Sequence, residues 1–300
     1  MSYSRTTLIA ILIGMGAAWG ITQPLSKIAV SEGYRDIGII FWQFAIGAGL
    51  LGALLLFRRK PLPMQPVHLR FYLFIALIGT VLPNWASFTA AVHLPAGILS
   101  IVIATVPMMA LPIAVGLGMD RFSPARITGL ALGLVAIVLI ALPDTSLPEA
   151  GMAVWLPIAL IAPFLYACEG NIVGKWGTYG LDAMQVLAGA SIVGMIISAP
   201  LAFLTGEWIN PLGPWGAPDW AILGSSIAHV AAYVTYVWLV GAAGAVFTAQ
   251  VGYLVTGFGI LWAKLILGES YSPWVWAALA LMMVGLFLVT PRPGAAQPAQ

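Results

Sequence analysis

Apolar residues run along this sequence in long segments that are separated by short polar or Pro/Gly-rich breaks. A helix needs about 20 mostly apolar residues to cross the hydrocarbon core of a bilayer. The segments have that length, so the pattern predicts an all-α membrane protein with ten transmembrane helices. Their expected ranges are 7–30, 37–57, 69–92, 96–118, 125–142, 152–175, 182–204, 219–240, 243–266 and 274–290.

The composition agrees with a membrane location. Of the 300 residues, 61% are hydrophobic and only 7% are charged, whereas a soluble domain carries about 25% charged residues. A soluble fold of this size could not hide so much apolar surface from water, so lipid must cover the outside. The net charge of +2 is too small and too scattered to suggest a nucleic-acid partner. Arg5 and the apolar run after it resemble a signal peptide, but further membrane segments follow, and we expect the run to be the first span.

The basic residues indicate how the spans are oriented, because cytoplasmic loops are enriched in Lys and Arg. With the N-terminus inside, only Lys27, Arg35 and Lys264 fall outside. The remaining basic residues fall inside, namely Arg5, Arg58, Arg59, Lys60, Arg70, Arg121, Arg126, Lys175 and Arg292. This distribution predicts a multi-pass protein of the bacterial inner membrane with both termini in the cytoplasm.

The sequence also contains an internal repeat. Residues 119–142 match residues 267–290, and each copy has an acid, an aromatic residue and Ser-Pro before a Gly-bearing apolar helix. We therefore expect a first five-helix repeat over 1–148, a second over 149–291, and a flexible tail over 292–300. An odd number of spans per repeat inverts the second copy in the membrane. Inverted repeats are typical of secondary transporters, whose substrate site lies near the midplane.

Several of these motifs resemble one known family. They are Trp19-Gly20 followed by Lys27, the segment TVPMMALP around Pro107, and the acids Asp120 and Glu269 before their Ser-Pro pairs. Together they resemble the EamA-type branch of the drug/metabolite transporter superfamily. The resemblance implies ten helices around a central cavity and export of amino acids, other metabolites or amphiphilic compounds. It does not name the substrate.

Glu169 is the main candidate for chemistry, because it is the only carboxylate well inside a predicted span. Placing a charge in lipid costs about 2.5–3.5 kcal/mol on insertion scales, so such residues usually face a cavity. The run Tyr166-Ala-Cys-Glu169-Gly170 is similar to the first helix of small multidrug resistance proteins, in which a membrane glutamate exchanges protons for cationic substrates. The alternative is a structural glutamate, snorkelling to the interface or paired with Lys175.

Other polar and aromatic residues inside the spans are weaker candidates for the substrate site. His229 suits proton relay or neutral packing. The amides and aromatics could line the cavity or simply join helices. The favoured ones are Asn84, Asn171, Gln250, Trp19, Trp85, Tyr166, Tyr233 and Tyr253.

The sequence excludes several other kinds of site and partner. It has no catalytic triad, metal-ligand cluster or phosphate loop, so we expect no enzyme activity, no metal and no cofactor. The leading hypothesis is a monomeric secondary exporter of an amino acid or related metabolite, with Glu169 as the candidate for proton coupling. The alternatives are an exporter of amphiphilic cations and an uncoupled facilitator. An intramembrane enzyme or a receptor subunit would belong to a different class.

Overall fold

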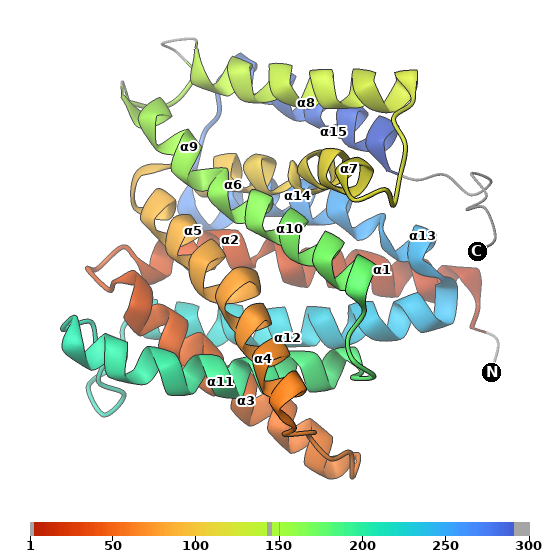
Figure 1. The fold of residues 1–300 in the computed structure, drawn as a ribbon. Helices are drawn as coiled ribbons and strands as arrows, with labels where there is room; N and C mark the ends of the chain where they lie inside the picture. The colour runs from red at the N-terminus through yellow and green to blue at the C-terminus, as the bar shows by residue number, and fades with distance from the viewer. Residues whose placement is uncertain (1–2, 143–145, 150, 291–300) are drawn as a thin grey trace.

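The computed structural model describes residues 3–142, 146–149 and 151–290, and its regular elements are all helices (Figure 1). The expected tail lies outside the described residues. The first half contains α1 (Arg5–Gly20), α2 (Thr22–Ala29), α3 (Asp36–Phe57), α4 (Pro66–Ala76), η1 (Leu77–Val81), α5 (Leu82–His93), α6 (Ala96–Ile103), α7 (Val106–Gly116) and α8 (Pro124–Ala141). The second half contains η2 (Met152–Trp155), α9 (Leu156–Ala159), α10 (Ile161–Trp176), α11 (Ala183–Leu204), α12 (Ala217–Ala243), α13 (Ala245–Thr248), α14 (Val251–Leu267) and α15 (Pro273–Val289).

Helices form at the positions of the predicted membrane segments, and they differ in whether they are long enough to span a bilayer. Eight stretches of helix are long and apolar enough to cross a bilayer, and the shorter apolar helices Val251–Leu267 and Pro273–Val289 follow them. The predicted ninth segment was wrong in one respect. The stretch 243–266 is not continuous, because Gly244 takes a positive φ of 86° and the short α13 ends in a turn before α14.

The repeated Ser-Pro motifs start α8 and α15. The Ser123 hydroxyl accepts a hydrogen bond from the backbone N–H of Arg126, and Ser272 does the same for Val275. Proline is favoured at the first helical position because its missing N–H would have no partner there. Both motifs therefore determine where α8 and α15 begin.

The helices of the two halves pack on one another. In Figure 1, α8 and α15 lie side by side at one edge of the bundle, and α3 and α11 lie at the opposite edge. Between them α14 contacts α1 and α6, while α10 contacts α7 and α5. The α8–α15 contact is very close. A Cβ atom on Gly129 would lie 2.7 Å from the carbonyl oxygen of Gly285, as expected for small residues at helix crossings in membranes.

One turn of the third span is a π-helix. In η1 the Leu82 N–H donates to the Leu77 carbonyl, five residues back. Pro83 follows directly and has no N–H, so it cannot supply the regular bond to the carbonyl four residues before it. Such single wide turns often occur at functional sites. This turn faces α10, which carries Glu169.

Candidate functional site

The half-buried Glu169 carboxyl group rests directly on the backbone of η1. A Cβ atom built on Gly79 would lie 2.7 Å from the carboxyl carbon and from both carboxyl oxygens. Among the described residues, no cation forms an ion pair with this group. Lys175 instead donates to the Leu117 carbonyl oxygen at 2.9 Å. The interpretation of Glu169 as the ion-pair partner of Lys175 was therefore wrong.

A chain of polar side chains leads away from Glu169 on the same helix. The Tyr166 hydroxyl of α10 donates to the Asn84 side-chain oxygen at 3.3 Å, and the Asn84 amide nitrogen donates to Gln43 Oε1 at 2.9 Å. These contacts link α10, α5 and α3. Two of the favoured candidates, Asn84 and Tyr166, are therefore in contact, and Gln43, an amide that was not among the favoured candidates, joins them.

A second group of candidates lies where α1 meets α12. The Trp19 indole donates to His229 Nδ1 at 3.2 Å, and the Trp19 ring also packs edge-on against Tyr236 at 6.0 Å between ring centroids. Because Nδ1 accepts this bond, the imidazole is neutral and carries its proton on Nε2. Tyr233 lies one turn from His229 on α12.

The other candidates do not join these groups. Asn171 is 7% exposed, and its amide nitrogen donates to the Ala110 and Ala167 carbonyls at 3.1 and 2.8 Å, so it ties α10 to α7. Gln250 lies exposed at the start of α14. Tyr253 packs against the main apolar core, and Trp85 is 41% exposed.

Gly79 is the residue at this site that sequence reasoning missed. One glycine among many apolar residues gives no signal by itself. The nearby Pro83 marks an irregular turn, but only the fold places that turn against Glu169. A cavity of about 720 Å³ opens on the neighbouring face of α10, where Cys168 and Ile172 line it together with residues of α4 and α7.

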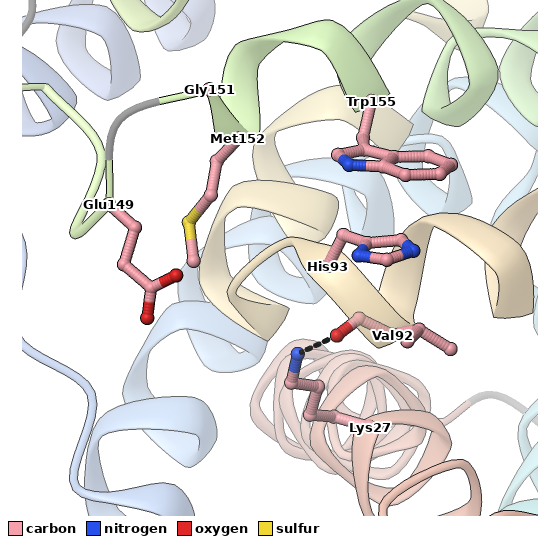
Figure 2. A pocket seen from close by; sticks show the side chains of 7 residues that line it. All are labelled: Lys27, Val92, His93, Glu149, Gly151, Met152 and Trp155. Atoms are coloured by element: carbon pink, nitrogen blue, oxygen red, sulfur yellow. Dashed lines mark hydrogen bonds between the residues drawn. The ribbon is translucent and has the colours of Figure 1, made fainter.

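A separate cavity of about 480 Å³ lies at the end of the bundle where Lys27 is found (Figure 2). The Lys27 ammonium donates to the carbonyl oxygens of Ala91, Val92 and Leu94 at 2.6, 3.2 and 3.1 Å. Lys27 thus binds carbonyl groups in the last turn of α5 and the carbonyl of the residue that follows the helix. Beside it, the His93 ring stacks on Trp155 with 3.6 Å between ring centroids.

The repeated acids before Ser-Pro have different partners. Glu269 accepts hydrogen bonds from the backbone N–H groups of Ala96 and Gly97 at 2.7 and 3.1 Å, so it caps α6. It also accepts one from the Tyr271 hydroxyl, and burial together with this contact raises the pKa of Tyr271. Asp120 instead binds Arg126, in the first turn of α8, at 2.6 Å.

Comparison with known proteins agrees with this arrangement. The model of the EamA-like transporter family matches residues 6–142 and again residues 153–290. The uncharacterized inner membrane transporter YedA of Escherichia coli K12 is 27% identical over 295 residues, covering 94% of this chain and 90% of YedA. YedA from E. coli O157:H7 matches to the same extent.

A solved crystal structure shares the fold. Its TM-score is 0.65 at 18% identity, and the match covers 96% of this chain and 97% of that chain. At this identity the likeness shows the fold alone. The two family matches span nearly the whole chain, and they agree with the run of apolar helices. The chain therefore belongs to the EamA-like transporter family of the drug/metabolite transporter superfamily, as a multi-pass inner-membrane protein.

Proposed function

We propose that this transporter exports a small organic solute by alternating access and that Glu169 couples the movement to protons. The observation that carries the proposal is the half-buried Glu169 carboxyl group, which lies inside a span with no counter-ion among the described residues. An ionisable group at such depth is costly and usually serves a substrate or proton pathway. A carboxyl group that binds a proton in one state and releases it in another can drive a solute across the membrane.

The neighbouring side chains favour an amino acid or related metabolite as the solute. The Tyr166–Asn84–Gln43 chain offers amide and hydroxyl groups, which can bind a carboxylate or an ammonium group. Trp19 and Tyr233 offer apolar faces for the rest of the molecule. An amphiphilic cation is the second choice, since it would use Glu169 and the aromatic rings but not the amides.

The packing of the helices supports ten spans arranged as two inverted five-helix repeats, over 1–148 and 149–291. Three contacts join a helix of the first half to its counterpart in the second half, namely α8 with α15, α3 with α11 and α6 with α14. The contact of α1 with α14 has its equivalent in the contact of α10 with α7, because α10 corresponds to α1 and α7 corresponds to α14 in the proposed repeat. Because both halves are fused in one chain, we expect a functional monomer. When wild-type protein is mixed with an inactive variant, the transport activity should then fall only in proportion to the wild-type fraction.

The two ends of the molecule differ, which supports alternating access. At one end Lys27 and Glu269 join the α5–α6 connection to the first and last spans. Their repeat counterparts, Lys175 and Asp120, bind Leu117 and Arg126 instead. We infer that the protein is closed at the Lys27 end, which faces outward if both termini are cytoplasmic.

The test uses purified protein in proteoliposomes with an imposed pH gradient. A panel of labelled amino acids and amphiphilic cations is offered to the wild type and to Glu169→Gln. Movement of one solute against its gradient by the wild type alone supports the proposal and names the substrate class. If both proteins move the solute equally and only down its gradient, the protein is a facilitator and Glu169 is structural.

A further inference from the structure

We propose that Gly79 is a positioning residue for Glu169: its bare π-helical turn holds the carboxyl group at the site where protons exchange. This inference rests on the proposed function of Glu169. It assigns a role to the wide turn Leu77–Val81, which the transport scheme alone does not need.

The contact between Gly79 and Glu169 involves the whole carboxyl group. A Cβ atom on Gly79 would lie 2.7 Å from three atoms of one carboxyl group, and real Cβ atoms essentially never approach other heavy atoms so closely. Only glycine leaves this space free. On α10 itself, Gly170 and Gly174 have nothing within 4 Å of a built Cβ. At this site the close approach is therefore made by Gly79 and not by the glycines of α10.

The same turn is polar as well as bare. Pro83 cannot donate a backbone hydrogen bond, so one carbonyl of the turn before it lacks its helical donor. A protonated carboxyl group is a hydrogen-bond donor, whereas a carboxylate only accepts. A carbonyl group left without its helical donor can therefore accept a hydrogen bond from the protonated form of Glu169, a bond that the carboxylate cannot donate.

A methyl group at Gly79 should displace the carboxyl group without unfolding the span. The colliding atoms are the far end of a flexible side chain rather than backbone, so the carboxyl group can move aside. Helices also tolerate alanine better than glycine. The effect of Gly79→Ala should thus fall on the position of Glu169 and not on stability.

The experiment compares Gly79→Ala with the matched control Gly174→Ala, which adds the same methyl group in open space on α10. Two properties are measured in proteoliposomes: proton-driven solute uptake, and the infrared C=O band of the protonated carboxyl group. The band is assigned by its loss in Glu169→Gln. We expect Gly79→Ala to move this band and to lower uptake by about tenfold or more, since small misplacements of reacting groups carry large penalties. Gly174→Ala should change neither.

A rescue variant separates positioning from general damage. In Gly79→Ala/Glu169→Asp the acidic side chain is one methylene shorter, so it makes room for the added methyl group. We expect it to exceed Gly79→Ala in uptake. An unmoved band and unchanged uptake in Gly79→Ala would overturn the inference. If instead the band moves but Glu169→Gln still couples uptake to protons, the positioning role holds and the proposed proton coupling fails.

Discussion

The carboxylate of Glu269 accepts a hydrogen bond from the backbone N–H of Ala96 at 2.7 Å, across 173 residues of sequence. The bond places a negative charge at the N-terminus of α6, where unpaired N–H groups and the helix dipole favour it. It joins the loop before the last span to the fourth span. The repeat counterpart Asp120 makes no such bond among the described residues and binds Arg126 locally.

This difference predicts unequal effects of removing the two acids. Glu269→Gln should lower the free energy of unfolding by about 1.5–3 kcal/mol, because hydrogen bonds to charged groups contribute about that much. Asp120→Asn should cost less, since it loses a partly exposed ion pair. Thermal unfolding in detergent measures both. Equal losses would mean that the α6 cap contributes little.

The amide–hydroxyl chain beside Glu169 should act as a unit. Asn84→Leu leaves both Gln43 and Tyr166 without their partner, so we expect KM for the transported solute to rise by about tenfold. Tyr166→Phe should have a smaller effect, because its bond to Asn84 is the longer one, at 3.3 Å. Adding Tyr166→Phe to Asn84→Leu should then change KM little further. Fully additive effects on KM would show that the two residues act separately.

Asp182 should make stability depend on pH in the acid range. Burial alone would raise its pKa, but the hydrogen bond from Lys60, the backbone bonds and the Lys60 charge hold the pKa below its ordinary value. A lowered pKa in the folded state stabilises the protein above the unfolded-state pKa of about 3.9. This contribution is lost as the pH falls from about 4 through the lower folded-state pKa.

The pair is partly exposed, so the effect should be at most about 1 kcal/mol and should weaken in high salt. Unfolding midpoints of the wild type and Asp182→Asn, measured at pH 6 and pH 3, should differ more at pH 6. If the two midpoints differ by the same amount at pH 6 and at pH 3, the ion pair is not the cause of the difference.

The close contact between α8 and α15 should not tolerate a side chain. In Gly129→Ala the new methyl carbon would lie 2.7 Å from the Gly285 carbonyl oxygen, a backbone atom that cannot turn aside. We expect a loss of about 1–3 kcal/mol in the free energy of unfolding, as for other overpacked sites. Gly49→Ala in α3 is the control, since nothing lies within 4 Å there. Similar unfolding midpoints for the two variants would contradict this reading of the interface.

Much of the architecture followed from the sequence. Stretches of about 20 apolar residues can only be accommodated in lipid as helices, and the observed bounds, such as Asp36–Phe57 against the expected 37–57, reflect this. The break between α13 and α14 was not predicted because only two residues, Ala249 and Gln250, separate two otherwise apolar helices. The Ser-Pro motifs were readable because helix caps are local: Ser123 and Ser272 bind N–H groups three residues away.

The sequence by itself determined that Glu169 is an isolated acid inside a span, since charge and hydropathy are properties of a local stretch. Only the tertiary structure decided its surroundings. In the folded chain Gly79 lies against the carboxyl group, Lys175 donates to the Leu117 carbonyl, and Asn171 donates to a backbone carbonyl of α7. The physical reason is that the contact partners of a side chain depend on how closely two helices that are far apart in sequence approach each other. That approach depends on the summed packing of the whole bundle and not on the residues next to either partner.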